Sequence, residues 1–492
     1  MAVTKRLSEL GLNAREGRNP ALTGITLDSR AVRPGMLFAA LPGTARHGAD
    51  FIATALEQGA AAVLTDAMGA VIGAQAIGLS EVALVVADDP REALAYAAAL
   101  WSGAQPGTMV AVTGTNGKTS VASFTRQIWA ALGHEAINIG TTGVEGAWAA
   151  PSSHTTPDQI TLHRMLAEAA AHGVTHAAME ASSHGLDQRR LEGVRLKAAG
   201  FTNLTQDHLD YHHTMEAYLE AKAALFTRLL PEDGVAVVNL DGAHGSDIAG
   251  LALDRGLRVL TVGKGQGADL QIAATRPDAT GQEVRYLWQG RAFQTRLDLI
   301  GAFQAENVAV AAGLAIAAGD GPGAVLAALP RLAGVRGRMQ LAATRKNGAP
   351  VFVDYAHTPD ALETALRALR PHVMGRLVVA FGAGGDRDRT KRPLMGAAAR
   401  GNADVLFVTD DNPRSEDPAA IRAAILAACP EANEVGDRAE AILRAVDALQ
   451  PGDALLIAGK GHETGQVIKG DIFPFDDVEQ ASIAVAALDG VI

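Results

Sequence analysis

The chain has 492 residues, a length typical of about three domains. Apolar residues make up 48% of it and charged residues 20%, which is ordinary for a folded protein and argues against intrinsic disorder. Acidic residues outnumber basic ones by 54 to 43, a net charge of −11, which disfavours non-specific binding to nucleic acids or anionic membranes.

The cysteine content and the apolar segments exclude further classes of protein. A single cysteine, Cys429, permits neither an intramolecular disulfide framework nor a cysteine-based zinc or iron–sulfur site. The N-terminus has no apolar signal region, and the uncharged segment that begins at Ala93 is interrupted by Gly103, Pro106 and Gly107. We therefore expect a soluble, cytoplasmic protein with no nucleic-acid partner and no membrane insertion.

The first part of the chain, residues 1–104, predicts a small α/β domain. Segment 25–30 is typical of a strand that runs into a turn, and 33–43 of an apolar strand between Pro-Gly turns. Segment 51–66 predicts a helix followed by a strand. The Gly/Pro-rich stretch 102–108 then predicts a linker to the next domain.

The second part, residues 105–335, predicts a doubly wound, mostly parallel sheet. It opens with an apolar strand, a glycine-containing loop and a helix that ends at Gly133. Further apolar runs, bounded by turn residues, lie at 173–180, 197–204, 234–240 and 258–263. Helical patterns separate several of these runs, including 215–230, and such alternation favours a parallel sheet. Residues 268–299 predict a small antiparallel insertion, and 304–318 a helix.

The third part, residues 336–492, predicts a Rossmann-like α/β domain. A boundary is expected near 334–340, in the Gly- and Arg-rich segment GVRGRMQ. The expected strands are 350–356, 376–382, 403–410 and 453–459, and the expected helices are 361–369 and 419–428. Strands and helices alternate here again, which is typical of the α/β class.

The strongest local signal is the segment 114–120, GTNGKTS, between a strand and a helix. In that setting, backbone N–H groups and the helix N-terminus bind phosphate, Lys118 reaches the terminal phosphates and the Thr119 hydroxyl ligates Mg²⁺. The candidate nucleotide-binding residues are Gly114, Thr115, Asn116, Gly117, Lys118, Thr119 and Ser120. The alternative is a chance Gly-Lys-Thr at a helix start, since the usual first glycine falls at Val112 and the loop is shortened.

Two further strand ends carry polar side chains. Glu180 ends the run 173–180, and His208 follows the run that ends at Asn203. Ligands of doubly wound sheets lie beyond the carboxyl ends of the strands, so we expect both side chains to face the bound triphosphate. A carboxylate suits Mg²⁺, and an imidazole more often marks a second metal position. For His208 alone, the alternative is a loop histidine hydrogen-bonded to the backbone.

Lys222 lies on a predicted helix, four residues after Tyr218. Most helical lysines are solvent-exposed, and this is the simpler interpretation of Lys222 alone. The apolar residues 223–226 indicate partial burial instead. A buried lysine has a depressed pKa and therefore a nucleophilic, neutral amine.

Together the motifs resemble the Mur ligases of bacterial cell-wall synthesis. The resemblance rests on ten motifs in the family's order, from the loop 114–120 onward: HTTPD (154–158), EASSHGLDQRR (180–190), NLTQDHLDYH (203–212), YLEAKAALF (218–226), GRMQ (337–340), DYAHTPD (354–360), GGDRDRTKRP (384–393), DNPR (411–414) and GKGHE (459–463). It extends from LDSR (27–30) over nearly the whole chain.

Within that family the chain looks most like the members that add diaminopimelate to a UDP-muramoyl dipeptide. The resemblance implies a UDP-substrate domain (1–104), a central ATP-binding domain (105–335) and an amino-acid-binding domain (336–492). It implies an ATP-dependent, ADP-forming ligase, EC 6.3.2.13, that makes a peptidoglycan precursor for cell-wall biogenesis, cell shape and cell division. The D-glutamate carboxylate attacks the ATP γ-phosphate, and the amine of diaminopimelate then attacks the acyl phosphate. Mg²⁺, a small-molecule acceptor and a monomer are also implied.

The resemblance assigns residues to each substrate. Lys118, Glu180, His208 and Lys222 are the implied catalytic residues, and Thr119, Glu180, His208 and carbamylated Lys222 the implied metal ligands. Asn307, Arg338, Asp354 and His357 match positions near ATP. Leu27, Ser29, Thr155, Thr156, Ser182, Gln188 and Arg190 match the UDP-substrate side. Arg387, Asp411, Asn412, Pro413, Arg414, Gly459 and Glu463 match the diaminopimelate side.

DNPR indicates which amino acid is added. Diaminopimelate resembles lysine with an extra carboxylate at its far end, and Arg387 and Arg414 can each present a planar guanidinium to it. Asp411 and Glu463 are placed to hold the distal ammonium. We expect both guanidinium groups to be buried, so that lysine would leave them unpaired and be rejected. Alone, Arg414 is equally typical of a surface residue at a helix start.

Two alternatives stay open on the sequence. One is a ligase of the same fold that adds lysine or extends folylpolyglutamate; the other is a nucleotide-binding regulatory protein without ligase activity. Three positions also depart from the family pattern: His154 and Gln304 stand where Asn is usual, and Gln340 where Glu is common. These departures concern contacts with UDP and adenine.

Overall fold

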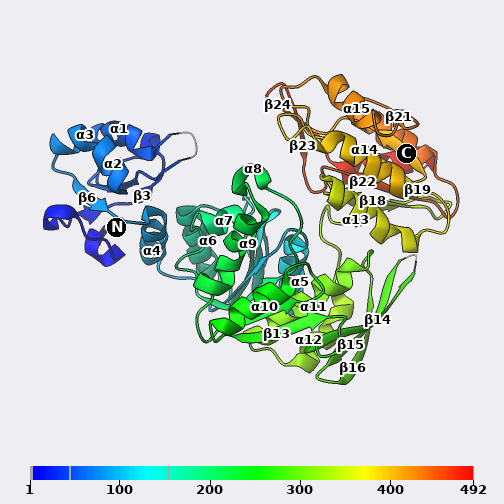
Figure 1. The fold of residues 1–492 in the computed structure, drawn as a ribbon, viewed down its shortest axis with the longest axis horizontal. Coiled ribbons are helices and arrows are strands. Elements are labelled where there is room, and N and C mark those ends of the chain that lie inside the picture. Colours follow the sequence, from blue (N-terminus) through cyan, green and yellow to red (C-terminus); the bar gives the residue numbers. More distant parts are fainter. Residues whose placement is uncertain (1–3, 44–45, 153, 279, 491–492) are drawn as a thin grey trace.

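Three α/β units follow one another along the chain of this computed structural model, which describes residues 4–43, 46–152, 154–278 and 280–490 (Figure 1). Each unit has its own main sheet, of four, ten and six strands. In Figure 1 the N-terminal unit (blue) and the C-terminal unit (yellow to red) lie on either side of the central one. In the described parts of the chain, no helix is long and apolar enough to cross a membrane.

The N-terminal unit has a parallel sheet in the order β3-β4-β5-β6. Its strands are β3 (Ile25–Thr26), β4 (Leu37–Ala39), β5 (Ala62–Thr65) and β6 (Ala83–Val86), with a separate ribbon of β1 (Lys5–Arg6) and β2 (Ala21–Leu22). Its helices are α1 (Ile52–Glu57), α2 (Ala67–Ile72), α3 (Ala74–Gly78) and α4 (Pro90–Ser102). Asp89 caps α4 and Pro90 occupies its first turn, which is the expected chemistry of a helix start.

The central sheet has the order β16-β15-β14-β13-β12-β11-β7-β10-β8-β9. Its parallel strands are β7 (Thr108–Thr113), β8 (Ala136–Gly140), β10 (His176–Glu180), β11 (Leu196–Phe201), β12 (Val235–Asn239), β13 (Arg258–Gly263) and the start of β14 (Leu270–Asp278). β9 (Gly143–Gly146), β15 (Gly281–Trp288) and β16 (Arg291–Leu297) pair antiparallel. This confirms the predicted doubly wound sheet and the predicted antiparallel insertion.

Helices cover both faces of the central sheet. α5 (Lys118–Ala131) and α11 (Phe303–Ala318) pack in one core cluster. α6 (Gln159–Ala171), α9 (Met215–Ala224) and α10 (Gly245–Asp254) pack in the other, while α7 (Ser183–Asp187), α8 (Leu209–His212) and α12 (Pro322–Ala328) are short. The helix expected over 215–230 is shorter than predicted, because α9 ends at Ala224 and a single π-helical turn, Leu225–Leu229, follows it.

The C-terminal sheet has the order β17-β18-β22-β19-β20-β21, with β17 antiparallel to the others. Its strands are β17 (Gln340–Thr344), β18 (Pro350–Asp354), β19 (Leu377–Phe381), β20 (Val405–Val408), β21 (Asn433–Glu434) and β22 (Ala454–Ala458). α13 (Pro359–Leu369), α14 (Lys391–Asn402) and α15 (Pro418–Leu426) pack on one face, and α16 (Arg438–Asp447) and α17 (Asp477–Leu488) on the other. A hairpin of β23 (Gly465–Ile468) and β24 (Asp471–Pro474) stands apart from the sheet.

Candidate active site

The loop between β7 and α5 is held in a shape that only glycine allows at two positions. Gly114 has φ +146°, and a Cβ there would lie 1.9 Å from Thr202 Oγ1. Gly117 has φ +89°, and a Cβ there would lie 2.4 Å from Asn307 Oδ1. The two glycines therefore bring β11 and α11 against the loop, and Asn307 lies beside it.

Two lysines meet at this loop. Lys118 Nζ donates to the carbonyl oxygens of Gly114 (2.9 Å) and Thr115 (2.8 Å), and Lys222 Nζ donates to the same Gly114 oxygen (2.8 Å). Lys222 is 1% exposed and its Nζ lies 4.5 Å from the centre of the Tyr218 ring. Burial and then the charge of Lys118 lower the pKa of Lys222 well below its usual value. Lys222 is thus a buried helical lysine, as the apolar neighbours indicated.

Glu180 ends β10 beside the first turn of α5. Its Oε2 accepts a hydrogen bond from the Thr119 hydroxyl (3.1 Å), and its Oε1 accepts one from the Thr141 backbone N–H (2.8 Å). The carboxylate is 1% exposed and lies over Gly140, where a Cβ would come within 2.0 Å of Oε1. A hydroxyl and a carboxylate at this distance form a donor set that fits Mg²⁺, which takes oxygen ligands and keeps several waters.

His208 lies farther out than the Thr119–Glu180 pair. Its backbone is left-handed (φ +53°), and its side chain is 44% exposed. Its ring packs edge-on against His184, with ring centroids 4.8 Å apart, and burial lowers its pKa. Over the described ranges, no group of three or more His, Cys, Asp or Glu side chains could by itself hold a metal ion. A metal here would need further ligands from water, from the substrate or from a modified Lys222.

Asp207 is a site carboxylate that the sequence analysis missed. Its Oδ2 lies 3.4 Å from His208 Nε2. Its negative charge opposes the lowering of the pKa of both Lys118 and Lys222, so it is close enough to interact electrostatically with both lysines. The signal was its position directly before His208 in the segment 203–212.

The residues expected on the UDP-substrate side form two groups. Thr156 Oγ1 donates to the Glu180 carbonyl (2.9 Å) and accepts from Ser182 N–H (3.0 Å), while Arg190 donates to the Thr156 carbonyl (2.6 Å). Arg190 also donates to Gln188 Oε1 (2.7 Å). The Thr155 and Thr141 hydroxyls lie 3.0 Å apart, which joins this network to Glu180. Leu27 and Ser29 belong instead to the N-terminal unit, where partly buried Leu27 packs against the core cluster and Ser29 begins a 3₁₀ turn.

One arginine connects the C-terminal unit to the segment 114–120, the candidate phosphate-binding loop. Arg338 Nη2 donates to Thr119 Oγ1 (3.2 Å), and its guanidinium carbon lies 4.7 Å from the centre of the Tyr355 ring. Asp354, at the end of β18, accepts from the backbone N–H groups of Met339 (2.6 Å) and Ala356 (2.9 Å). His357 Nδ1 lies 2.8 Å from the Tyr355 carbonyl oxygen. The four residues expected near ATP therefore come from α11 (Asn307), from the segment before β17 (Arg338), from the end of β18 (Asp354) and from the loop after it (His357).

On the diaminopimelate side, the DNPR loop is buried at its first three residues and partly buried at Arg414. Arg414 has φ +51° and donates to the Gly385 carbonyl (2.7 Å). Arg387 is exposed. The expectation that both guanidinium groups are buried is therefore wrong for Arg387, because the segment 386–390 that carries it lies at the surface. Asp411 Oδ2 is buried without a hydrogen-bond partner among the described residues, against Gly459, where a Cβ would come within 2.4 Å of it.

The residues that depart from the expected pattern all have local partners. Gln304 Oε1 accepts from Asn307 Nδ2 (3.2 Å), so this glutamine orients the amide beside the phosphate loop. Gln340 Oε1 accepts from the backbone N–H of Gly337 (2.8 Å), one residue before Arg338. The backbone N–H of His154 lies 3.4 Å from Ser152 Oγ.

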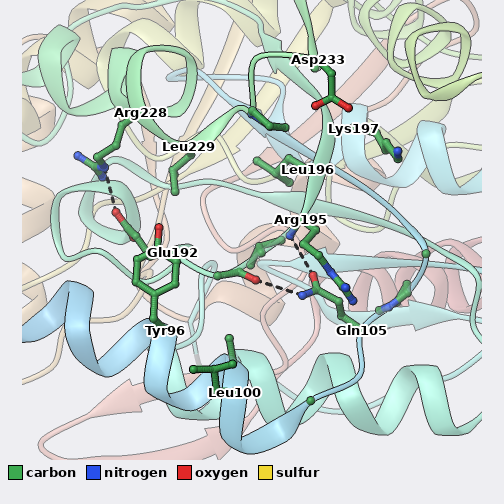
Figure 2. A pocket seen from close by; sticks show the side chains of 18 residues that line it. Tyr96, Leu100, Gln105, Glu192, Arg195, Leu196, Lys197, Arg228, Leu229 and Asp233 are labelled. Carbon is green, nitrogen blue, oxygen red and sulfur yellow. Dashed lines mark hydrogen bonds and ion pairs between the residues drawn. The ribbon is translucent and has the colours of Figure 1, made fainter. Parts of the chain in front are cut away.

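A cavity of about 770 Å³ lies elsewhere, where α4 and the segment 103–107 meet the central unit (Figure 2). Gln105 spans it, donating to the Gly193 carbonyl (3.1 Å) and accepting from the Arg195 backbone N–H (3.0 Å). An ion pair between Arg189 and Asp89 (2.8 Å) also joins the two units. None of the expected site residues lines this cavity, so it belongs to the junction of the units.

Family models match all three units of the chain. The Mur ligase family catalytic domain matches residues 21–101, the Mur ligase middle domain residues 112–315, and the Mur ligase glutamate ligase domain residues 337–461. The chain belongs to the Mur ligase family. Its glycine loop, Glu180 and Lys222 all fall inside the matched middle domain of this Mur ligase.

Relatives of this Mur ligase are similar over its full length. The UDP-N-acetylmuramoyl-L-alanyl-D-glutamate–2,6-diaminopimelate ligase of Caulobacter vibrioides is 51% identical over 99% of this chain and 100% of its own. The enzyme of the same name from Bradyrhizobium diazoefficiens is also 51% identical, over 95% of each chain.

Solved structures of Mur ligases share the fold. One of a UDP-N-acetylmuramoyl-L-alanyl-D-glutamate–2,6-diaminopimelate ligase is 35% identical, covers 99% of both chains and has a TM-score of 0.71. The MurF ligase of Thermotoga maritima in complex with ADP has a TM-score of 0.63 and covers 95% of this chain and 98% of its own, but at 17% identity it indicates the fold alone.

Proposed function

We propose that this Mur ligase adds meso-2,6-diaminopimelate to UDP-N-acetylmuramoyl-L-alanyl-D-glutamate with the hydrolysis of ATP to ADP and phosphate, a step of peptidoglycan precursor synthesis. The observation that carries the proposal is identity of about half of all residues, over the full length, to ligases of that name. The phosphate loop beside a buried carboxylate supports the use of ATP. The need for ATP favours a cytoplasmic location.

The chemistry requires activation of a carboxylate, because a carboxylate oxygen is a poor leaving group. An oxygen of the D-glutamate carboxylate attacks the γ-phosphorus of ATP, the bond to the β-phosphate oxygen breaks, and ADP leaves. The amine of diaminopimelate then attacks the acyl carbon, loses a proton and expels phosphate as the amide forms. Lys118 and the N–H groups of residues 114–120 are suited to hold the transferred phosphoryl group and to neutralise its charge.

The Thr119 and Glu180 oxygens are the protein groups that fit Mg²⁺, with His208 and carbamylated Lys222 proposed as further ligands. When bound, Mg²⁺ would supply positive charge that offsets the charge of the phosphates. Lys222 is suited to carbamylation because a neutral amine attacks CO₂: the new N–C bond forms, one proton leaves, and an anionic carbamate results. The lowered pKa of Lys222 supplies that neutral amine.

The other substrates are assigned to the flanking units. The proposal places the UDP moiety on residues 1–104 at Leu27 and Ser29, and ATP on 105–335. It places the muramoyl dipeptide on the network of Thr155, Thr156, Ser182, Gln188 and Arg190, which reaches Glu180 through hydrogen bonds. Diaminopimelate is placed on 336–492, with the DNPR loop, Arg387, Gly459 and Glu463.

Product analysis tests this proposal. The purified chain is incubated with ATP, the UDP-muramoyl dipeptide and one candidate amino acid at a time: meso-diaminopimelate, L-lysine or L-glutamate. We expect a new amide product by mass spectrometry with diaminopimelate only, and phosphate release that depends on the UDP-linked acceptor. Ligation of lysine at an equal rate would overturn the assigned specificity, and acceptor-independent phosphate release would overturn the ligase.

A further inference from the structure

The Lys460 side chain is completely buried, although lysine is among the residues least often buried. It is 0% exposed and lies directly after β22, in the loop 459–463 that borders the proposed diaminopimelate site. Burial of an ammonium group is costly unless each of its N–H donors finds an acceptor and its charge finds a partner. The surroundings of Lys460 meet both conditions.

Lys460 Nζ makes three contacts, as many as an ammonium group has donors. It donates to Asn412 Oδ1 (3.1 Å), to Glu463 Oε2 (3.1 Å) and to the Gly465 carbonyl oxygen (2.6 Å). These acceptors come from the DNPR loop, the loop 459–463 and the start of β23. One buried side chain therefore joins the three segments that surround the site.

The same contacts determine how Asn412 and Glu463 are oriented. Asn412 Oδ1 accepts from Lys460 and from the Val467 backbone N–H (2.9 Å), which assigns the oxygen and leaves Nδ2 to donate to Glu463 Oε2 (2.8 Å). The hydrogen bonds from Asn412 and Lys460 therefore both end on Glu463 Oε2, and neither of them uses Oε1. The Glu463 side chain is 32% exposed, whereas Lys460 lies wholly beneath it.

We propose that Lys460 is a positioning residue that holds Glu463 with one carboxylate oxygen free to accept the distal ammonium of the incoming diamino acid. This inference rests on the proposed function and extends it to a residue that contacts no substrate. The hydrogen bond from Lys460 Nζ to Glu463 Oε2 restricts rotation of the carboxylate. The ammonium end of the ligand is thereby recognised separately from the carboxylate end, which is assigned to Arg414.

Two amino acids that differ only at the distal ammonium test this role. Diaminopimelate carries that group, while L-2-aminopimelate keeps the distal carboxylate and lacks the ammonium. For Lys460→Met we expect KM for diaminopimelate to rise about 10-fold or more, since a hydrogen-bonded charge partner of Glu463 is lost. We expect KM for L-2-aminopimelate and for ATP to change by less than about 2-fold. Glu463→Gln should show the same pattern.

The double variant Lys460→Met/Glu463→Gln should be little worse for diaminopimelate than either single variant, because one residue acts through the other. Lys469→Met is the matched control, since Lys469 is exposed at the turn between β23 and β24 and only its backbone N–H contacts Arg414.

Equal losses with both amino acids, or additive effects in the double variant, would mean that Lys460 only supports the loops, and would overturn the role. If Lys460→Met fails to fold, Glu463→Gln still decides: equal losses with both amino acids would refute recognition of the ammonium. Absence of any ligation of diaminopimelate by the unaltered chain would instead overturn the proposed function itself, and this role with it.

Discussion

Lys118 and Lys222, 104 positions apart in the sequence, donate hydrogen bonds to one and the same carbonyl oxygen, that of Gly114, at 2.9 and 2.8 Å. Two ammonium groups this close in a buried volume repel each other, so one of them is readily deprotonated. Burial and Lys118 lower the pKa of Lys222 well below its usual value, whereas burial lowers the pKa of Lys118 and the charges of Glu180 and Asp207 oppose that lowering. This arrangement agrees with the proposed roles, in which Lys118 binds phosphate and the amine of Lys222 reacts with CO₂.

Lys222→Ala should lose activity by about 10²-fold or more, because a group that stabilises the reacting phosphate is missing. Acetate or formate in the buffer should restore part of it, since the missing group is a carboxylate. The assay is phosphate release with the UDP-linked acceptor, and Lys197→Ala, at an exposed lysine, is the control. Full activity of Lys222→Ala without added acid would refute the carbamate.

Arg414→Ala should raise KM for diaminopimelate about 10- to 100-fold and leave KM for ATP nearly unchanged, because a planar, two-pronged donor to a carboxylate is lost. Steady-state kinetics with each substrate varied in turn measures both constants. Arg387→Ala should have a smaller effect, since Arg387 is exposed and Arg414 is partly buried. Equal rises of KM for both substrates would assign Arg414 a structural role.

Local patterns were sufficient to predict most of the fold. The apolar run before the loop 114–120 and the helical pattern after it correspond to β7 and α5, and the strand expected at 173–180 corresponds to β10. These elements depend on periodicity and on glycines near in sequence. The order of strands was not predictable, because it depends on pairings such as that of β18 with β22, about 100 residues apart.

The site was predictable only where a motif marks it. Thr119 and Glu180 were expected together and lie 3.1 Å apart, although the metal role of both remains a prediction. No local pattern marks Lys460 as buried, since its burial depends on the fold of the loops around it, including Asn412, 48 positions away. The exposure of Arg387 likewise depends on how a loop lies on the C-terminal sheet, which the spacing of arginines does not encode.

Breaking the buried ion pair of Arg438 with Asp477 should destabilise the C-terminal unit. The two side chains are 1% and 0% exposed and share two hydrogen bonds, of 2.8 and 2.7 Å. Asp477→Ala leaves the guanidinium buried without its counterion, which we expect to lower the free energy of unfolding by about 3–5 kcal/mol. Urea unfolding followed by circular dichroism measures the change.

A matched variant is Arg444→Ala, which removes an exposed i,i+4 pair with Glu440 and should cost less than about 0.5 kcal/mol. If both substitutions lower the free energy of unfolding equally, the buried pair contributes no more to stability than the exposed pair.

His462 should make stability depend on pH. Burial and then Arg338 lower the pKa of His462 to about 4. Below its ordinary pKa of about 6.5, the unfolded chain takes up a proton that the folded chain does not, so stability falls as the pH drops from about 6.5 to about 4. The loss from this group is at most about 3 kcal/mol.

The test measures the melting temperature of the unaltered chain and of His462→Gln between pH 7.5 and pH 4, at intervals of about half a pH unit. It compares the slopes of melting temperature against pH for the two chains. The His462→Gln chain should lose less stability over this range, and identical slopes would show that His462 is not responsible.

The contact of Arg338 with Thr119 crosses from one lobe of the molecule to another. Thr119 lies in the first turn of α5, at the proposed phosphate-binding loop, so a swing of the C-terminal lobe that lengthens this contact also alters the surroundings of the Thr119 hydroxyl. With the nucleotide bound as proposed, lobe position and nucleotide occupancy are thermodynamically linked. By reciprocity, a nucleotide that favours the joined lobes is itself bound more tightly by a molecule whose lobes are already together.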